Sequence, residues 1–510
     1  MTSCFLWQYS LPKVKSGESA VEMCPRYPEP VQLDHPIPIL KDALEKVDLL
    51  LRHKIRNPGL PALSAIVIYN DTVLWTGNFG KRNISSDFSG LPNEYSIYRI
   101  GSISKLFPTI MLHKLWEEGK ITSLDDSLEC YAPNFSIKNP LGHLKESKLP
   151  SSRDGRSYFE DKPLPPRPSS VTLRRMASQL SEGREECHYS NLAFSLLAHV
   201  LAEQVAKSKY QDWVSENILD RLGMEDTGFD ITPNVHSRMT VGVYGSGEVA
   251  PLYDLGWYRP SGQMFSTAAD LAKLAMVFLG TYHRHLLEPE TLKVMLTPLL
   301  TCSRDYFANK TGTPWEINEQ MGYDLLRKDG DIDGFSATFS LVPKLCLSFI
   351  VLMAGPRPQG GDLVTQVYEY LIPSLESAFR EVEKKLNPPP SPAPYVGYYT
   401  FSNLTFYEIK VGPRGELLMQ QFGPHIEKVI PEEYRTIKLH HLQDRIFQVV
   451  FEKEFPCVLK LGPASISLEA QDGQLFNFYP FDPKGVSPGF DVPGLNTYNI
   501  LRLQRRPVFS

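Results

Sequence analysis

The sequence of 510 residues predicts an α/β domain followed by an all-β domain. An early helix and hairpin, a helical middle and two late strands are typical of an α/β (α+β) sandwich. In such a sandwich an antiparallel sheet has helices at its faces and a helical subdomain beside it. A proline-rich run at 387–394 then indicates a stiff linker and a domain boundary. Beyond this linker, short strands separated by Gly and Asp-Gly turns predict a small antiparallel barrel or sandwich.

The first part of the chain is expected to hold an irregular segment, a helix and a hairpin. Residues 1–38 are rich in proline and polar side chains, which predicts a disordered or poorly ordered lead-in. Apolar residues at helical spacing predict a helix over 39–53. The apolar runs 65–69 and 72–76 flank Asn70-Asp71, and this pattern predicts a β-hairpin that turns at that dipeptide.

The middle of the chain is predicted to be helical. A helix over 102–118 would stop at Gly119, and Pro108 inside it would remove a backbone hydrogen bond and kink it. Further helices are expected over 191–206 and 210–222. The polar, proline-rich stretch at about 139–170 is predicted to be an exposed insertion.

Late strands complete the first predicted domain, 39–386. Two strand-like runs, 335–341 and 346–353, are separated by Val342-Pro343-Lys344, and an amphipathic helix is expected to end near 386. The predicted C-terminal domain, 395–510, contains five strand-like runs, which are 408–411, 417–420, 447–451, 458–461 and 466–470.

Composition argues against two classes of partner. The net charge is −5, and Arg502, Arg505 and Arg506 are too few to form a nucleic-acid-binding patch, so we expect no nucleic-acid partner. No apolar run approaches the roughly 18 residues of a membrane-spanning helix, and the N-terminus lacks the pattern of a signal peptide.

Glycosylation motifs and cysteines give signals about the compartment that point in different directions. Five Asn-x-Ser/Thr motifs favour a secretory or extracellular route, at Asn70, Asn83, Asn134, Asn309 and Asn403. The seven cysteines are scattered, form no zinc-binding spacing and are expected to be free structural thiols. The sequence therefore predicts no metal site and leaves the compartment open.

Ser102 and Lys105 are the first candidates for catalysis. They stand three residues apart at the start of the predicted helix, which places both on one face. A serine there benefits from free backbone N–H groups, and a lysine in a partly dry pocket can lose its charge and accept the serine proton. An exposed serine and lysine with no function would show the same spacing, so the motif alone is weak.

Two further motifs supply polar groups that could complete such a site. Tyr189 precedes a predicted helix and could move a proton, and Asn191 could bind a substrate amide; the structural alternative is a packed aromatic and a helix cap. Lys328-Asp329-Gly330 lies on a predicted edge strand. The lysine could keep Tyr189 or Lys105 deprotonated, and Gly330 would let substrate approach the backbone. The N–H of Asp331, with that of Ser102, would form an oxyanion hole.

Taken together and in this order, Ser-x-x-Lys, Tyr-x-Asn and Lys-x-Gly resemble the active-site set of serine β-lactamases and penicillin-binding proteins. Further marks of the class C and esterase-like branch are the runs at 124–126, 172–178, 222–228 and 260–268. The resemblance covers about residues 40–380 and implies the β-lactamase/transpeptidase-like sandwich. The C-terminal part is loosely similar to the lipocalin-like domains that some members carry.

The resemblance also implies a role for each motif residue. Ser102 would be the nucleophile, Lys105 the base, Tyr189 a second acid/base, Asn191 a substrate-binding group and Lys328 the cation of the third motif. No metal or organic cofactor is implied, and the partner would be a small-molecule or peptide substrate. A conventional Ser-His-Asp hydrolase and a zinc protease are disfavoured, because neither Gly-x-Ser-x-Gly nor His-Glu-x-x-His occurs.

Two departures from the family pattern leave two functions open. The segment 178–188 is shorter than its family counterpart, as in a splice variant that lacks part of this loop. Asp329 also replaces the usual Thr or Ser, so it would repel an anionic substrate and could pair with Lys328. One function is a serine hydrolase of amides, peptides or esters that turns over penicillins poorly. The other is a catalytically impaired pseudoenzyme that serves as a binding or scaffold module.

Overall fold

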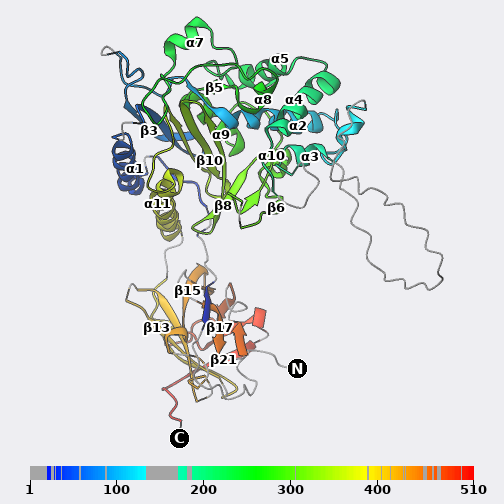
Figure 1. Cartoon of the computed structure of the whole chain (residues 1–510). Helices are drawn as coiled ribbons and strands as arrows, with labels where there is room; N and C mark the ends of the chain where they lie inside the picture. The colour runs from blue at the N-terminus through cyan, green and yellow to red at the C-terminus, as the bar shows by residue number, and fades with distance from the viewer. Residues whose placement is uncertain are drawn as a thin grey trace, which may run out of the picture. The chain divides into compact units, whose positions relative to one another are not determined.

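The structure is a computed structural model, and the chain divides into two compact units (Figure 1). One unit spans Lys41–Ile372, and the other combines Met1–Leu40 with Pro373–Ser510. The structure describes residues 20–23, 28, 30–35, 37–56, 59–86, 89–133, 171–180, 187–304, 306–386, 390–403, 405–413, 415–424, 426–428, 430, 432–451, 456–461, 464–467, 473–495 and 497–509. The predicted insertion at 139–170 and most of the short 178–188 segment lie outside these residues.

An antiparallel sheet of eight strands forms the centre of the first unit, in the order β3-β2-β11-β10-β9-β8-β7-β6. Strands β2, β10 and β11 are buried along their whole length, as expected of strands that are covered on both faces. The strands are β2 (Ala62–Tyr69), β3 (Thr72–Gly80), β6 (Leu300–Thr301), β7 (Lys310–Thr311), β8 (Glu316–Gln320), β9 (Tyr323–Ile332), β10 (Phe335–Val342) and β11 (Leu347–Met353). The predicted hairpin is confirmed, since β2 and β3 pair on either side of Asn70-Asp71.

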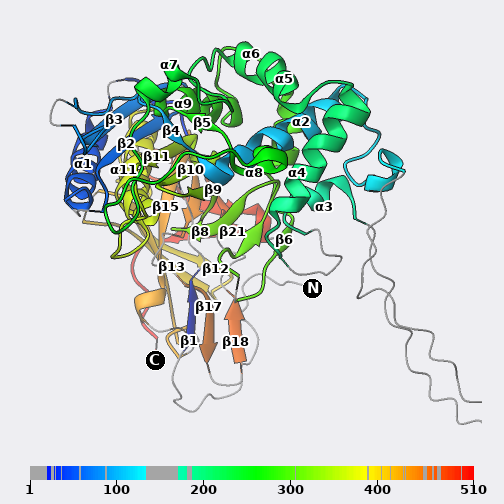
Figure 2. The same ribbon diagram turned by 45° about the horizontal axis from the view of Figure 1, so that its top comes forward.

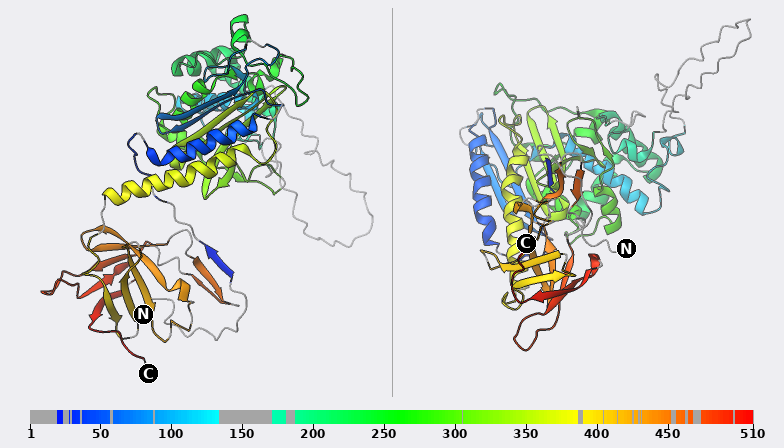
Figure 3. Two further views of the ribbon diagram at one scale, coloured as in Figure 1. Left: turned by 90° about the vertical axis from the view of Figure 1, so that its left-hand side faces the viewer. Right: turned by 90° about the horizontal axis from the view of Figure 1, so that it is seen from below.

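Helices cover both faces of this sheet. Figure 3 shows α1 (Lys41–Lys54) and α11 (Leu363–Leu386) side by side on one face, where the Lys46 ammonium lies 5.9 Å from the centre of the Tyr370 ring. The helix α9 (Ala268–Phe278) packs against β2 and β11. The α/β sandwich is thereby confirmed.

The remaining helices of this unit form the helical part beside the sheet and its connections. They are η3 (Gly101–Lys105), α2 (Leu106–Glu117), η4 (Leu128–Cys130), α3 (Leu173–Met176), α4 (Asn191–Val200), η5 (Leu201–Ala206), α5 (Tyr210–Val214), η6 (Ser215–Leu219), α6 (Asp220–Leu222), α7 (Pro233–Arg238), η7 (Gly256–Tyr258), α8 (Arg259–Gly262), α10 (Pro289–Leu296) and η8 (Pro343–Leu345). A short two-stranded sheet joins β4 (Tyr98–Arg99) to β5 (Phe265–Ser266). Among the helices within the described ranges, none combines the length and apolar character of a membrane span.

The predicted helix over 102–118 needs one correction. Its first turn is the 3-10 helix η3, and the α-helix α2 begins only at Leu106. Pro108 is therefore the third residue of α2, within its first turn, where proline is tolerated, and not in the helix interior. Gly119, with φ near 70°, follows the helix as predicted, and its N–H bonds back to the carbonyl of Trp116.

The second unit contains a closed antiparallel barrel of eight strands, which confirms the predicted all-β domain. Its strands are β12 (Gly397–Phe401), β13 (Thr405–Val411), β14 (Leu417–Phe422), β15 (Thr436–Gln443), β16 (Ile446–Val450), β19 (Leu475–Phe478), β20 (Gly489–Val492) and β21 (Thr497–Leu503). Pairing of β12 with β21 closes the barrel. Alternate side chains point inward and form a core rich in aromatic rings, including Tyr399, Tyr407 and Phe490. Short helices η9 (Glu432–Tyr434) and η11 (Pro493–Leu495) connect its strands.

The N-terminal segment is not irregular throughout, contrary to the prediction. Residues of β1 (Ala20–Met23) form a strand that pairs with β17 (Pro456–Leu461), and β17 pairs with β18 (Ala464–Ser467) (Figure 2). These three strands make a separate small sheet. The partner of this four-residue strand lies more than 400 residues away in the sequence. Local sequence therefore could not predict the strand. A single 3-10 turn, η2 (Pro38–Leu40), leads into α1.

Candidate active site

Ser102 and Lys105 lie on the 3-10 helix η3, and this geometry brings their side chains together. A 3-10 helix has three residues per turn, so residues i and i+3 lie directly above one another. The Lys105 Nζ is 2.9 Å from the Ser102 Oγ. Both α8 and β9, which Figure 2 labels, contact η3.

Lys105 is fully buried, and its surroundings favour the neutral amine. Burial, with a smaller contribution from the nearby Lys328 ammonium, lowers the pKa of Lys105 well below its usual value. Its Nζ also contacts two oxygens that can only accept, the Asn191 Oδ1 at 2.7 Å and the Ser261 carbonyl at 2.8 Å. In a neutral amine these acceptors take both N–H groups, so the lone pair faces the Ser102 hydroxyl.

Tyr189 and Asn191 reach the same serine from the start of α4. Ser190 is the N-cap of this helix, because its hydroxyl accepts a hydrogen bond from the backbone N–H of Ala193. The cap is thus Ser190 and not Asn191, which leaves the Asn191 side chain to bind Lys105. Tyr189, just before the cap, donates from its hydroxyl to the Ser102 Oγ at 2.5 Å.

The surroundings of Tyr189 favour its protonated form over the phenolate that the sequence also allowed. Burial raises the pKa of Tyr189, and this effect outweighs the opposing effects of the Lys328 ammonium and of the hydrogen bond to Ser102. The Nζ atoms of Lys105 and Lys328 lie 4.9 Å and 5.3 Å from the centre of the Tyr189 ring. The tyrosine is therefore arranged to give a proton and not to act as a phenolate.

Lys328 on β9 has a buried carboxylate partner that the sequence did not reveal. The Glu316 carboxylate on β8 forms an ion pair with the Lys328 ammonium and also accepts the Asp329 backbone N–H at 3.1 Å. Burial acts to lower the pKa of Lys328, but Glu316, together with smaller contributions from Tyr189 and Asp329, outweighs it, so the net shift is upward. In the pairing of β8 with β9, Glu316 lies opposite Arg327, next to Lys328. No local sequence motif predicts this register.

Two glycines allow β9 to approach η3 closely. A Cβ on Gly330 would stand 2.0 Å from the Ile100 carbonyl oxygen. Gly101 has φ of +51°, and a Cβ there would stand 2.9 Å from the backbone N of Asp331. Any larger residue at either position would push the strand away from the nucleophile.

The register of the β9–β10 hairpin directs the backbone N–H of Asp331 toward η3. Ile332 and Phe335 close a two-residue turn, so they exchange hydrogen bonds, and the next pair, Asp331 with Ser336, does not. The Asp331 N–H consequently points away from β10. Strand β8 pairs with β9 only as far as Arg327, so this edge is free at Asp331, beside η3. The geometry suits a donor to a developing oxyanion.

Lys328 donates to the Asp329 backbone carbonyl at 2.9 Å, but the expected ion pair with the Asp329 carboxylate is not formed among the described residues. That carboxylate forms an ion pair with Arg327 at 2.9 Å and accepts a hydrogen bond from the Thr338 hydroxyl at 2.6 Å. Although burial acts to raise the pKa of Asp329, the guanidinium groups of Arg327 and Arg357 lower it. The negative charge of the third motif is therefore compensated by arginines, which the sequence analysis did not single out.

A disulfide next to the site contradicts the expectation that the cysteines are free. Cys187, two residues before Tyr189, is bonded to Cys302, in the connection between β6 and β7. Disulfides are typical of proteins that fold in an oxidising compartment. Within the described ranges, Cys130 and Cys346 are free.

The structure therefore brings all seven predicted site residues to one place, and it adds others. Ser102, Lys105, Tyr189, Asn191 and Lys328 meet through side chains, whereas Gly330 and Asp331 meet η3 through the backbone. Sequence reasoning missed Glu316, Arg327, Arg357, the Cys187–Cys302 bond and the direct role of Ser261. A signal existed only for Ser261, which belongs to the run 260–268 that marks the class C branch.

Comparisons with known proteins give one consistent result. The sequence matches the Beta-lactamase family profile over residues 47–369. It is 57% identical, over 96% of this chain and 100% of the relative, to a human (Homo sapiens) protein named "Putative beta-lactamase-like 1". It is 23% identical, over 66% of this chain and 92% of the relative, to the D-alanyl-D-alanine-carboxypeptidase/endopeptidase AmpH of Escherichia coli.

A solved structure shares the fold over most of the chain. The octameric penicillin-binding protein homologue from Pyrococcus abyssi superposes with a TM-score of 0.52 at 18% identity. The match covers 86% of this chain and 96% of that one. At this identity the likeness concerns the fold alone.

Proposed function

The chain belongs to the β-lactamase family, and from this premise we propose that it hydrolyses an amide, peptide or ester through an acyl-Ser102 intermediate. One observation carries the proposal. The Ser102 Oγ lies within hydrogen-bond distance of a buried lysine whose pKa is lowered and of a tyrosine that keeps its proton. A base and an acid thus contact the same nucleophile.

Acylation follows from these two contacts. Neutral Lys105 accepts the Ser102 proton as the Oγ attacks the substrate carbonyl carbon, and the carbonyl electron pair moves to its oxygen. The N–H groups of Ser102 and Asp331 stabilise that oxyanion. When the intermediate collapses, the bond to the leaving amine or alcohol breaks, and the leaving atom takes the proton of Tyr189. Lys105 returns its proton to Tyr189, and water then hydrolyses the acyl-serine by the same steps.

Asn191 and Lys328 support these steps without reacting. The Asn191 Oδ1 accepts from Lys105, which leaves the Nδ2 of the same amide to donate to a substrate carbonyl. Lys328 stays charged against Glu316, and its field favours the neutral form of Lys105. In this proposal Lys328 is the permanent cation and Lys105 the base.

The substrate class is narrowed by the third motif. Asp329 has no hydroxyl to donate to a substrate carboxylate, and it is engaged with arginine. We therefore expect a neutral or cationic substrate and slow turnover of penicillins. The similarity to AmpH, named as a carboxypeptidase and endopeptidase, supports amide chemistry.

Labelling of the serine tests the proposal directly. The full chain and its Ser102→Ala variant are incubated with a fluorophosphonate or a β-lactone and analysed by intact mass. We expect one adduct on the parent chain and none on the variant. The absence of an adduct on folded protein would overturn the hydrolase and favour the binding or scaffold module. Rapid hydrolysis of benzylpenicillin would overturn the substrate class alone.

A further inference from the structure

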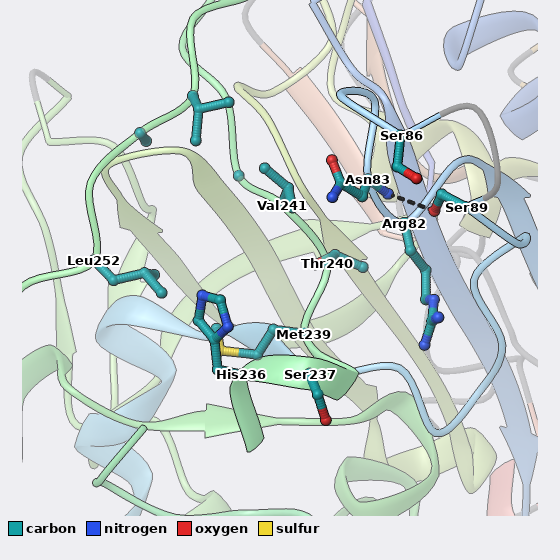
Figure 4. A pocket seen from close by; sticks show the side chains of 13 residues that line it. Arg82, Asn83, Ser86, Ser89, His236, Ser237, Met239, Thr240, Val241 and Leu252 are labelled. Atoms are coloured by element: carbon teal, nitrogen blue, oxygen red, sulfur yellow. Dashed lines mark hydrogen bonds between the residues drawn. The ribbon is translucent and has the colours of Figure 1, made fainter. Parts of the chain in front are cut away.

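A cavity lies apart from the residues assigned to catalysis. It measures about 640 Å³, within the usual range for small-molecule sites. Figure 4 shows one wall from the segment after β3, with Arg82 and Asn83, and the opposite wall from α7 and the following loop, with His236 and Leu252. Thr240 and Val241 lie between them. None of the seven site residues lines it.

Arg82 and Asn83 can each present hydrogen-bond donors to this cavity. Arg82 has no hydrogen-bond or ion-pair partner for its guanidinium among the residues whose placement is described. The Asn83 Oδ1 already accepts the Ser85 N–H at 2.9 Å, which leaves the Nδ2 of Asn83 to donate. The hydroxyl of Thr240 is already used, since it donates to the Ile97 carbonyl. Of the thirteen described residues that line the cavity, none is acidic.

Beside His236 and three serines, the lining includes five apolar side chains. Met239, Val241, Val249, Ala250 and Leu252 contribute side chains to it. A guanidinium with free donors is best satisfied by a carboxylate or a phosphate, which accept hydrogen bonds in its fork geometry. The apolar side chains favour an uncharged hydrocarbon or aromatic body on the same molecule.

We propose that this cavity binds a small amphiphilic anion, with its carboxylate or phosphate on Arg82 and its apolar body against Val241, Val249 and Leu252. The site is an accessory one, and its existence does not depend on the proposed hydrolase. Its floor is nevertheless joined to the catalytic region at two points. The Thr240 N–H bonds to the Ile97 carbonyl, on the segment that leads into η3, and Gly242 packs against Gly334 in the β9–β10 turn.

Calorimetric titration with matched probes tests the proposal on the full chain. The probes are 4-phenylbutyrate and 4-phenylbutyl phosphate, with 4-phenylbutanol and 4-phenylbutylamine as neutral and cationic controls of the same shape. We expect at least one anion to bind tenfold or more tightly than the alcohol and the amine. Arg82→Gln is expected to remove this preference, whereas Lys81→Gln, at the neighbouring exposed position outside the lining, keeps it.

A second variant guards against misfolding of the first. Val249 is 53% exposed, so Val249→Glu adds a carboxylate to the wall without entering the core, and anion binding should weaken at least tenfold. Labelling of Ser102 should be unchanged in both variants, which separates this site from the catalytic one.

Three results would overturn the accessory site. One is the absence of binding by every probe at millimolar concentration, and another is equal binding of anion and alcohol. The third is preferential binding of the amine that is lost in Asp87→Asn. Asp87 follows the lining residue Ser86 in the sequence, and such a result would mean that the cavity binds cations. Anion binding that persists unchanged in Arg82→Gln would place the probe elsewhere and has the same consequence.

Discussion

Burial acts in opposite directions on Lys105 and Tyr189, because one is charged when protonated and the other when deprotonated. A dry environment favours the neutral form of each, so it lowers the pKa of the amine and raises that of the phenol. In the proposed mechanism, the same lack of water makes one side chain the base and its neighbour the acid. No histidine is needed for this division of roles.

The lowered pKa of Lys105 predicts how reactivity depends on pH. Below that pKa the amine carries a proton and cannot accept another, so the rate of Ser102 labelling should fall tenfold per pH unit as the solution becomes more acidic. Above it the rate should reach a plateau, and this plateau should begin well below the pH range in which an ordinary lysine loses its proton. The pKa values of Lys328 and Tyr189 are both raised, so neither should end the plateau near neutrality. The measurement is the second-order rate constant with a fluorophosphonate between about pH 4 and pH 9.

A matched variant identifies the titrating group. Lys105→Arg keeps a cation that cannot lose its proton in this range, so labelling should be at least a hundredfold slower at every pH. A parent chain whose rate constant is flat down to the acid limit would contradict the assignment of Lys105 as the base.

Glu316 is predicted to be the main support of the Lys328 charge. Glu316→Gln removes the only carboxylate that the structure describes within ion-pair distance of the Lys328 ammonium, and burial then lowers the pKa of Lys328. An unpaired buried ammonium costs about 3–5 kcal/mol of the free energy of unfolding. We expect a large loss of stability in thermal denaturation and labelling slowed by roughly tenfold or more.

The control for this change lies on the same strand. Glu319→Gln makes the same chemical change at an exposed position of β8 and should alter the free energy of unfolding by at most about 0.5 kcal/mol. Equal behaviour of the two variants would show that Glu316 has no special role.

At the scale of residues, the sequence predicts those site residues that belong to a short motif with a fixed spacing. Ser102 and Lys105 are three positions apart, and Tyr189 and Asn191 are separated by one residue, so local patterns are sufficient to find them. Glu316 differs, because it reaches Lys328 only through the register of β8 on β9. Asp329 was misjudged for the same reason, since its arginine partners include Arg357, beyond β11 in the chain.

At the scale of elements, η3 and β9 approach each other closely, and the residues at the contact are glycines, which have no side chain. The predicted α-helix is a 3-10 helix at the motif and an α-helix only afterwards. Sequence periodicity does not distinguish these two helices over five residues, because the i and i+3 positions share a face in both. The tertiary contact with β9, made possible by Gly101 and Gly330, is absent from any local pattern.

The Cys187–Cys302 bond is predicted to position Tyr189. Cys302→Ser releases the segment that carries Cys187, and the loss of a natural disulfide typically costs about 2–5 kcal/mol of stability. Because Tyr189 is only two residues away, we expect labelling of Ser102 to slow by tenfold or more at temperatures where the variant remains folded. Cys130→Ser removes an exposed free thiol and serves as the control. Unchanged labelling in the folded Cys302→Ser variant would mean that α4 and its cap hold Tyr189 without the disulfide.

At the scale of the whole molecule, the sequence predicted the β-barrel but not the small sheet of β1, β17 and β18. Strands at regular spacing between Gly-containing turns indicate antiparallel pairing, and consecutive strands do pair in most of the barrel. The runs predicted at 458–461 and 466–470 correspond in part to β17 and β18, which lie outside the barrel. In their separate sheet β17 pairs with both β1 and β18. A pairing between the two ends of the chain cannot be deduced from the order of local signals.

Separate cores predict separate folding of the two units. The core around the catalytic residues draws its buried side chains from Ala62 to Ala354, and that of the barrel draws them from Tyr395 to Ile500. Because each core is complete within its own stretch, we expect thermal unfolding of the full chain to show two transitions. A fragment of residues 39–386, which keeps α11 whole, should unfold cooperatively and label at Ser102 within about threefold of the parent rate. The Ser102→Ala form of the fragment gives the background. A fragment that is soluble and folded but unlabelled would mean that the catalytic groups need the C-terminal unit, and the barrel would then be part of the enzyme's mechanism and not an attached domain.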